Sequence, residues 1–536
     1  MKKAMKCDSV RNNFGARPQV TQWRNRPVFL RLTRRLGAAA TICAWLSSSH
    51  SLTAQPTISR LFLDATNVVI AFTSAHRPIS QITLQSKPHL DALGWNRVEA
   101  ATLADLGAGR YEITLPRSGQ QAQFYRIHVE ESRSDAGILD PSHLTTIEVD
   151  MDADDWVSLG GDTRFGLGLT LAEVSQAFYA IRGQCAVPWP DGYRWFPANL
   201  TVDGVRLFPV GIRRKGFIGS LSVDRKPALK IKTDKYVEGQ FLGDTERITL
   251  NNNAGDTTGI FACLAYQVFT AAGYPAPRCN LASVRVNGQD MGPYTNIEAI
   301  KKSFLERAFG DDSGSLYEGI FTDFVAEWLP RWETQTSDTD PARRPLAFVA
   351  EALCVSDAQL VESLNSVLNI DRYITYWALE VILDHGDSYS AARNNFYVYF
   401  DPTDGGRAVF IPWGIDKLPN ANATKADIGR FLYAEVPRRL SRIPQMADAM
   451  LGEIDRLMRE VWDVHRLLES IDSLDALARQ AGRGDSASVQ TIRSWIQTRP
   501  TVISELIARG MPISAENKAP CLADKPDGGG KPDGKP

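Results

Sequence analysis

Acidic and amide side chains with the spacing of a metal-binding and proton-transfer site lie between positions 384 and 416. Asp384 and Asp387 lie three positions apart, Asn395 stands before an alternating apolar segment, and Asp416 follows the next apolar segment. Carboxylate and amide oxygens are ligands that Mg²⁺ accepts, and a carboxylate can take the proton of a substrate hydroxyl. The pattern therefore predicts a magnesium–nucleotide site, and an acidic loop that only caps a helix and a strand is the alternative.

Three predicted elements have to bring these side chains together. An apolar helical pattern covers residues 373–382 and breaks at Asp384. The alternating segments 396–400 and 408–411, joined by turn residues, predict a β-hairpin. Because the two paired strands share their open end, the hairpin directs Asn395 and Asp416 toward one point.

A basic, glycine-containing turn and a lysine-rich strand lie upstream of these elements. Gly216 lets backbone N–H groups approach a phosphate closely, and Ser220 ends the same turn. Lys226 follows, and Lys230 and Lys232 share one face of a predicted strand. A strand lysine can neutralise a phosphate, and edge-strand lysines that only discourage aggregation are the alternative.

The order of these motifs resembles the spore-coat protein H (CotH) kinase family of secreted atypical protein kinases, over roughly residues 140–510. The similar segments are, in chain order, Arg213–Gly216, Lys226–Lys232, Leu250–Asn252, Gly273–Arg278, Val286–Gly288, Ser315–Gly319, Gly386–Asp387, Asn394–Tyr399 and Pro412–Asp416. One position departs from the family pattern, since Gly414 stands where the W-D-x-D motif has its first acidic residue. If that acidic residue binds the metal in the family, catalysis in this chain is impaired.

The resemblance implies ATP- and Mg²⁺- (or Mn²⁺-) dependent phosphoryl transfer to a protein hydroxyl, in particular that of serine. In this interpretation Asp387 accepts or orients the hydroxyl proton, Asp384 is the alternative base, and Asn395 and Asp416 bind the metal. Lys230 is the favoured phosphate-binding lysine. The resemblance completes the nucleotide-binding set with Lys226, Lys232, Gly216, Ser220, Trp413 and Glu298. Glu298 is expected to pair either with the nucleotide lysine or, on the surface, with Lys301 or Lys302.

Two other functions fit the same residues. A surface or adhesion protein with a kinase fold and weakened chemistry is favoured by Gly414 and by the β-rich front of the chain. An extracellular hydrolase with Asp384 and Asp387 as an acid–base pair is the third possibility. Incubation with labelled ATP distinguishes the kinase from the other two functions.

Composition and the first residues bear on location and partners. The 536-residue chain is 43% hydrophobic and 23% charged, with a formal net charge of -2, which is ordinary for a soluble globular protein and does not point to nucleic acid. Basic residues precede a short apolar segment at 36–46 and small residues lead to Ala54, the pattern of a secretory signal. We expect a secreted, periplasmic or cell-surface protein, not membrane-spanning after signal cleavage, whose partners are ATP and an unidentified exported or surface protein substrate.

We expect an α+β fold, with a two-lobed atypical protein-kinase-like domain behind a small all-β, sandwich-like module. The predicted boundaries are 1–54 for the signal peptide or basic leader, 55–131 for the β module, 140–515 for the kinase-like domain and 516–536 for a disordered low-complexity tail. Asp154 is predicted to cap a helix rather than to bind calcium, and Asp256 to cap the helix of residues 258–271. One disulfide is possible, and the spacing of the cysteines leaves its partners open.

Overall fold

The computed structural model describes two compact units, Met1–Ser132 and Arg133–Pro536, which we treat separately. The described residues are 135–512, without 185, 218–225, 244, 337–341 and 420–425, and in the first unit 29–32, 43–45, 57–63, 67–73, 82–87, 96–98, 101–106, 110–116 and 123–129. The predicted tail 516–536 and most of the predicted leader 1–54 lie outside these ranges.

The described part of the first unit consists of strands. One sheet has the order β2-β1-β9-β5-β6 and the other β3-β4-β8-β7, with antiparallel pairing throughout. Val68, Ile70, Phe72, Tyr111 and Ile113 are buried together, as expected for strands whose alternate side chains face one core. The strands are β1 (Phe29–Leu32), β2 (Cys43–Trp45), β3 (Thr57–Leu63), β4 (Asn67–Thr73), β5 (Ile82–Lys87), β6 (Asn96–Arg97), β7 (Thr102–Asp105), β8 (Arg110–Pro116) and β9 (Gln123–Val129).

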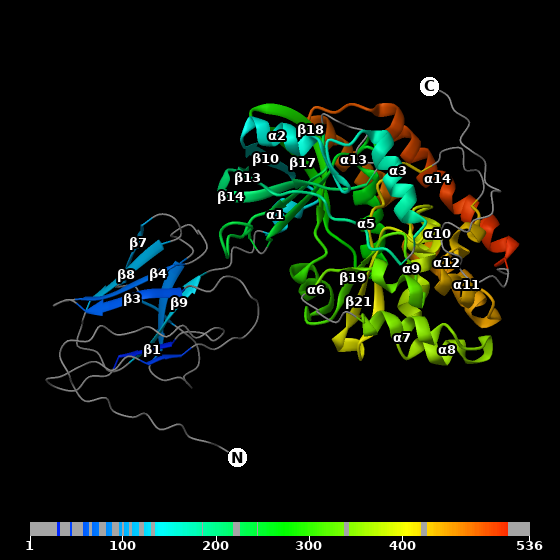
Figure 1. Cartoon of the computed structure of the whole chain (residues 1–536), viewed down its shortest axis with the longest axis horizontal. Helices are drawn as coiled ribbons and strands as arrows, with labels where there is room; N and C mark the ends of the chain where they lie inside the picture. Colours follow the sequence, from blue (N-terminus) through cyan, green and yellow to red (C-terminus); the bar gives the residue numbers. More distant parts are fainter. Residues whose placement is uncertain are drawn as a thin grey trace, which may run out of the picture. The chain divides into compact units, whose positions relative to one another are not determined.

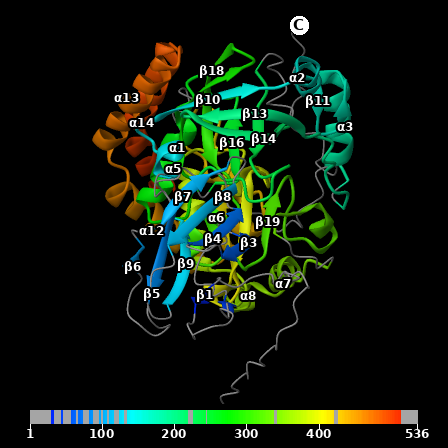
Figure 2. The ribbon, with the colours of Figure 1, turned by 90° about the vertical axis from the view of Figure 1, so that its left-hand side faces the viewer.

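A closed barrel forms the first part of the second unit (Figures 1 and 2). Its strand order is β10-β13-β14-β15-β16-β18-β17, and β10 pairs with β17 in parallel. Leu229 and Ile231 are buried in the barrel interior, so the alternation of a strand places Lys230 and Lys232 on its outside. The strands are β10 (Leu144–Asp150), β13 (Phe196–Val202), β14 (Val205–Arg214), β15 (Leu229–Lys232), β16 (Arg247–Asn251), β17 (Cys279–Val286) and β18 (Gln289–Glu298).

The N-caps of two helices near the barrel differ from those predicted. The cap of α2 is Asp152, whose side chain accepts hydrogen bonds from the amides of Asp154 and Asp155, so Asp154 itself lies in the first turn. The N-cap of α5 is Ile260 rather than the predicted Asp256, because the helix begins later than expected. The Asp256 carboxylate still accepts a hydrogen bond from the amide of Phe261, the first residue of α5, at 2.9 Å. The neighbouring elements are α1 (Asp135–Leu139), α2 (Ala153–Gly160), β11 (Asp162–Thr163), β12 (Gly166–Leu167), α3 (Leu171–Arg182) and α5 (Phe261–Ala271).

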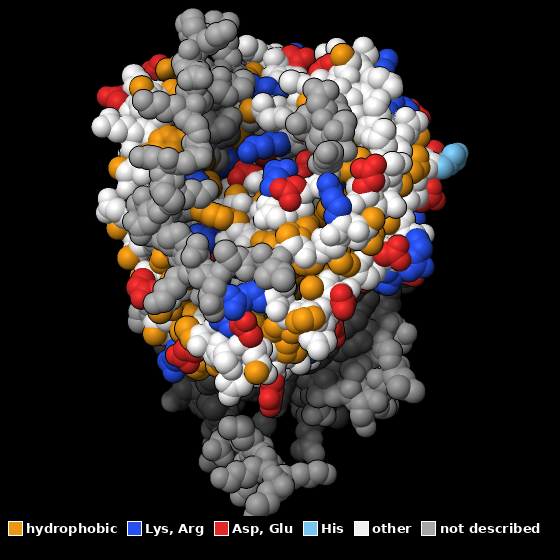
Figure 3. Space-filling view, turned by 90° about the vertical axis from the view of Figure 1, so that its right-hand side faces the viewer, with side chains coloured by type: hydrophobic (Ala, Val, Ile, Leu, Met, Phe, Trp, Pro, Cys, Tyr) orange, Lys and Arg blue, Asp and Glu red, His pale blue; other side chains and the backbone are white. Residues whose placement is uncertain are grey.

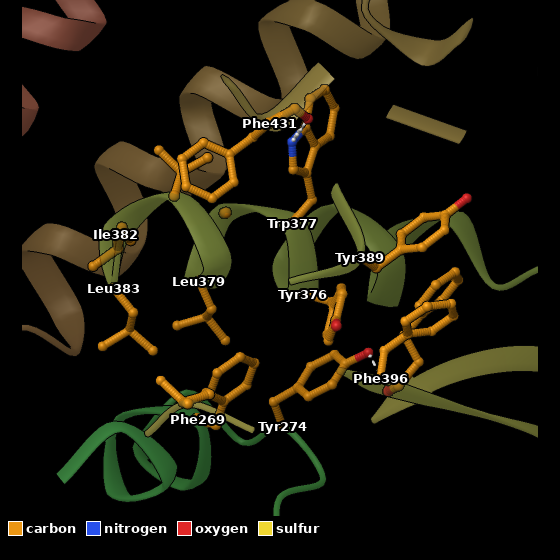
Figure 4. Packing of buried hydrophobic residues seen from close by; sticks show 14 of the residues in the cluster. Phe269, Tyr274, Tyr376, Trp377, Leu379, Ile382, Leu383, Tyr389, Phe396 and Phe431 are labelled. Atoms are coloured by element: carbon orange, nitrogen blue, oxygen red, sulfur yellow. Dashed lines mark hydrogen bonds between the residues drawn. The ribbon is translucent and has the colours of Figure 1, made fainter. Parts of the chain in front are cut away.

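The remainder of the unit is a four-stranded sheet surrounded by helices. The order β20-β19-β21-β22 contains the predicted hairpin, with Phe396 opposite Pro412 at its open end. Behind it, α9 is buried along most of its length (Figure 4), and Trp377 donates to the carbonyl of Phe431 at 3.0 Å. The elements are α6 (Lys302–Phe309), β19 (Leu316–Gly319), η2 (Ala326–Arg331), β20 (Glu333–Thr334), α7 (Arg344–Ala352), α8 (Asp357–Asn365), α9 (Ile370–Ile382), α10 (Tyr389–Ala392), β21 (Phe396–Asp401), η3 (Pro402–Asp404), β22 (Arg407–Pro412), η4 (Ile428–Leu432), α11 (Glu435–Leu440), α12 (Pro444–Glu460), α13 (Val464–Gln480) and α14 (Ser486–Arg509).

The mixture of helix and sheet agrees with the predicted α+β class. A disulfide between Cys263 and Cys279 joins α5 to β17, a pairing that the sequence left open. Within the described residues, every helix is too short or too polar to cross a membrane.

Candidate functional site

The loop that follows α9 carries the first acidic residues of the candidate site. Arg499 of α14, which is 2% exposed, donates hydrogen bonds to the last carbonyls of α9, those of Val381 at 2.6 Å and Ile382 at 2.7 Å. The chain then turns at Asp384, whose φ of 50° is in the left-handed region, and whose carboxylate pairs with Arg430 at 2.9 Å. A distant arginine therefore holds the helix end from which the acidic loop starts.

Asp387 lies at the centre of a small polar network. One carboxylate oxygen pairs with the Lys417 ammonium at 3.1 Å and the other accepts from the Asn394 amide at 3.3 Å. The Asn395 side chain donates to the backbone carbonyl of Asp387 at 3.1 Å. These contacts bring the predicted base, Asp387, and the predicted metal ligand, Asn395, into direct contact.

Gly414 packs closely against the Asn395 side chain. Its φ is +62°, and a Cβ at this position would lie 2.5 Å from Cγ and 2.7 Å from Oδ1 of Asn395. Both the backbone angle and the space require glycine here. At Gly414, where the chain departs from the family motif, the Asn395 amide therefore occupies the space that a larger side chain would need.

Asp416 faces the same region from the other side. The pKa of its carboxyl is raised to about 6, chiefly by burial, with the Lys215 ammonium acting in the opposite direction and the Asp387 charge adding to the rise. The loop before α5 supports this position, because the Leu418 amide donates to the Gly255 carbonyl at 3.1 Å. Asp416 and Asp387 thus repel each other across one site, which is the condition that a bound cation relieves.

Lys215 is the lysine that interacts with Asp416, and the sequence analysis did not select it. The pKa of Lys215 is lowered to about 7, chiefly by burial and also by the nearby Lys230. Its ammonium donates to Asn251 and lies 5.7 Å from the centre of the Trp413 ring. The signal was present in the sequence, since Lys215 directly precedes Gly216 in the basic turn.

Three lysines and one glutamate line the outside of the barrel beside this point. Burial lowers the pKa of Lys230, and lowers that of Lys301 to about 7, while Glu318 acts in the opposite direction on both. Glu318 also accepts from the Gln335 amide at 2.9 Å. Lys215, Lys230 and Lys301 therefore form a partly exposed positive cluster with Glu318 as an acidic neighbour, and charges that have lost part of their water shell attract an anion more strongly.

The other candidate residues lie in different surroundings. Lys226 donates to the Pro293 carbonyl at 2.6 Å, and Lys232 pairs with Asp234 at 3.4 Å. Glu298 is buried between Arg278, at 2.9 Å, and Arg307, so neither the nucleotide lysine nor Lys301 or Lys302 is its partner. Gly216, with a φ of 104°, accepts a hydrogen bond from the Tyr193 hydroxyl at 2.7 Å, and Ser220 lies outside the described residues.

A cavity of about 460 Å³ opens between the two loops of the site. Its lining includes Asp384, His385 and Asp387 from the loop after α9, and Gly414 and Lys417 from the loop after β22. His385 is buried, which lowers its pKa to about 4, and its ring nitrogen lies 3.1 Å from the Trp413 carbonyl. The neutral imidazole therefore ties the two loops together.

Charged side chains of both signs lie near the middle of the face of this unit shown in Figure 3, beside a group of hydrophobic side chains. The described part of this face thus differs from the extended basic surface typical of nucleic-acid-binding proteins.

The donor chemistry of the site fits Mg²⁺. Asp416 offers a carboxylate oxygen and Asn395 an amide oxygen, both hard ligands. The described residues contain no group of three or more His, Cys, Asp or Glu side chains placed to hold a metal ion. Mg²⁺ is commonly held by one or two carboxylates with the substrate phosphates completing its shell, and one carboxylate with one amide matches that pattern.

Comparison of the sequence with protein-family models finds a matching family. Residues 212–510, more than half of the 536-residue chain, match the family described as CotH kinase protein. The chain therefore belongs to the CotH kinase family, as its sequence motifs predict. Comparison with curated proteins finds no match for it.

Proposed function

We propose that this protein transfers the terminal phosphoryl group of ATP to a serine hydroxyl of an exported protein, with Mg²⁺ or Mn²⁺. The proposal is supported by the hydrogen bond from the Asn395 side chain to the Asp387 carbonyl and by the electrostatic influence of Asp387 and Lys215 on the carboxyl of Asp416. Phosphoryl transfer depends on placement and on neutralisation of charge, and this site contains the groups for both.

Asp387 is the better base of the two candidates. Its pairing with Lys417 orients the carboxylate without burying it, since 27% of the side chain remains exposed. Asp384 is 14% exposed and directs a carboxylate oxygen to Arg430. In the proposed reaction Asp387 receives the hydroxyl proton as the serine oxygen bonds to the γ-phosphorus and the bond to the ADP oxygen breaks.

Asp416 and Asn395 would hold the metal. The metal, when bound, neutralises charge that develops on the phosphate oxygens. Because the pKa of Asp416 is raised to about 6, its carboxyl is ionised at neutral pH and becomes partly protonated in mild acid. The loss of Asp416 ionisation therefore sets a lower pH limit for metal binding.

Lys215 and Lys230 would bind the phosphates. Burial lowers the pKa of both, and Lys230 adds to the lowering at Lys215, so an anion bound between them would raise both pKa values. Trp413, whose ring lies beside Lys215, would contact the nucleotide. In this arrangement the barrel and the helix-rich part act as the two lobes of a kinase-like domain, and the first unit is an accessory β module.

Export is supported by the Cys263–Cys279 disulfide, because such bonds persist in oxidising compartments. The signal-like segment ending near Ala54 points the same way.

A binding protein with a kinase-like fold and weak chemistry is the second candidate, and Gly414 is the observation that favours it. The two functions separate when purified protein is incubated with γ-labelled ATP and Mg²⁺ or Mn²⁺, beside Asp387→Asn and Asp416→Asn variants. Label transfer by the wild type only supports the kinase. Nucleotide binding without transfer supports the second candidate, and the absence of both refutes the nucleotide site.

A further inference from the structure

A second cavity, of about 480 Å³, adjoins the candidate catalytic cavity. Gly386 and Arg430 line both cavities. The remaining walls of the second cavity come from α10 (Ala391), from η4 and the residue after it (Leu432 and Tyr433) and from the segment after α14 (Pro512). The proposed reaction described above leaves this cavity without a role.

The wall between the cavities is the Arg430 side chain. Its guanidinium pairs with Asp384 at 2.9 Å, yet 49% of the side chain remains exposed. A Cβ on Gly386 would lie 2.3 Å from a guanidinium nitrogen of Arg430, so a larger residue at 386 would displace the arginine. An occupant of the second cavity therefore meets Arg430, with the loop of Asp384 and Asp387 directly behind it.

The second cavity is built on a fixed framework. The Tyr433 amide donates to the Ser390 carbonyl at 3.0 Å, and the Tyr433 carbonyl accepts from Arg393 at 2.8 Å. Arg393 is in turn paired with Asp323 at 2.9 Å, and both side chains are fully buried. Because its walls are tied to buried charges, the cavity is preformed and needs little ordering when a ligand enters.

The chemistry of the lining defines the ligand. Arg430 is the charged side chain of the lining, which otherwise consists of glycine, alanine, leucine, tyrosine and proline. A half-exposed guanidinium beside apolar and aromatic walls favours a ligand that carries a carboxylate close to a small or apolar group. A cavity of this volume has room for a short stretch of polypeptide.

We propose that this second cavity binds the acceptor segment of the substrate protein and selects a serine that has an acidic residue next to it. The inference rests on the proposed phosphoryl transfer and names its substrate class. Arg430 binds the acidic side chain, and the neighbouring serine passes Gly386, which lines both cavities, to reach Asp387. There the serine oxygen gives its proton to Asp387, bonds to the γ-phosphorus, and the ADP oxygen departs.

The test uses the full chain with Mg²⁺ and ATP and two serine peptides of equal length, one with aspartate and one with lysine beside the serine. A charge-assisted contact contributes about 1.5–3 kcal/mol, so the wild type should prefer the acidic peptide by about 10- to 100-fold in kcat/KM. Arg430→Glu should reverse the preference. The ratio of the two peptides is the readout because a general loss of activity cancels from it.

Variants that fill the cavity test its location. Ala391→Phe and, from the exposed opposite wall, Pro512→Trp should raise the KM for the acidic peptide about ten-fold and weaken binding of its fluorescein-labelled form. Both should leave peptide-independent ATP hydrolysis within two-fold, as should Gln490→Phe, a control on an exposed face of α14.

The outcomes separate this inference from the proposed function. Equal use of both peptides, with unchanged KM in both filling variants, overturns the acceptor cavity while the kinase stands. A wild type that neither hydrolyses ATP nor labels any peptide refutes the phosphoryl-transfer function and this inference with it.

Discussion

Restoring a side chain at Gly414 should damage the site rather than repair it. The family motif invites the substitution Gly414→Asp as a way to recover a metal carboxylate. The structure predicts the opposite result, because position 414 has a φ of +62° and a Cβ there would lie 2.5 Å from Cγ of Asn395.

The cost has two parts that can be separated. A left-handed backbone angle costs a non-glycine residue about 1–2 kcal/mol, and forcing extra atoms into a packed site costs about 1–3 kcal/mol. Gly414→Ala should therefore lower the free energy of unfolding by about 2–5 kcal/mol. Gly482 has a φ of +82° with no atom within 4 Å of its hypothetical Cβ, so Gly482→Ala should cost only the first part, about 1–2 kcal/mol.

Denaturant unfolding of the wild type, Gly414→Ala, Gly414→Asp and Gly482→Ala measures these values. Metal-dependent nucleotide binding, followed by calorimetry, should fall in both position-414 variants, since each displaces the Asn395 amide. A Gly414→Asp protein that binds the metal nucleotide more tightly than the wild type, or a Gly414→Ala protein as stable as Gly482→Ala, would refute the reasoning.

Three further predictions follow from buried charges and the disulfide. Lys215→Met should weaken ATP binding at least ten-fold by calorimetry, because the ammonium lies among desolvated groups that favour an anion. For Asp416, the folded pKa of about 6 lies above the ordinary aspartate value of 3.8, so its protonation stabilises the metal-free fold. This contribution to the free energy of unfolding should grow as pH falls from about 7 to 4 and be absent in Asp416→Asn. Replacing Cys263 and Cys279 together by alanine should lower the free energy of unfolding by about 3 kcal/mol, measured with denaturant, since the bridge closes a loop of 16 residues.

Each of these predictions has a control and a contrary outcome. Lys302→Met, at a side chain that is 63% exposed, should leave ATP binding unchanged, and equal losses in both lysine variants would contradict the assignment of Lys215. The pH effect is the difference between wild type and Asp416→Asn, because His385, whose pKa is lowered to about 4, acts with the opposite sign in both proteins. Parallel pH profiles of the free energy of unfolding in these two proteins would contradict the predicted contribution of Asp416. Reducing agent should destabilise the wild type and leave the alanine variant unchanged.

Local patterns determined much of the fold. The hairpin of β21 and β22, the Asn287-Gly288 turn between β17 and β18, and the amphipathic stripe of α12 all follow from alternation, turn residues and helical periodicity. Boundaries were less certain, since Asp152 rather than Asp154 caps α2, and the two lie close enough that either can reach the free amides.

The candidate site also has features that local sequence patterns predict and features that they do not. Its acidic and amide residues stand in or next to sequence motifs, so Asp384, Asp387, Asn395 and Asp416 could be selected as candidates from the sequence. Partners far apart in the chain were not, because spacing says nothing of contacts made by folding. Glu298 is enclosed by Arg278 and Arg307 rather than by a lysine, and Lys215, not Lys230, interacts with Asp416.

By itself, the sequence determined the kinds of chemistry available to this protein, since residue type and local spacing decide which ligands and bases exist. The tertiary structure decided which of them act together. Arg499 reaches the end of α9 across more than a hundred residues, and Gly414 closes on Asn395 because the hairpin brings their backbones into contact. Distances between residues remote in sequence, and the burial that shifts their pKa values, exist only once the chain has packed.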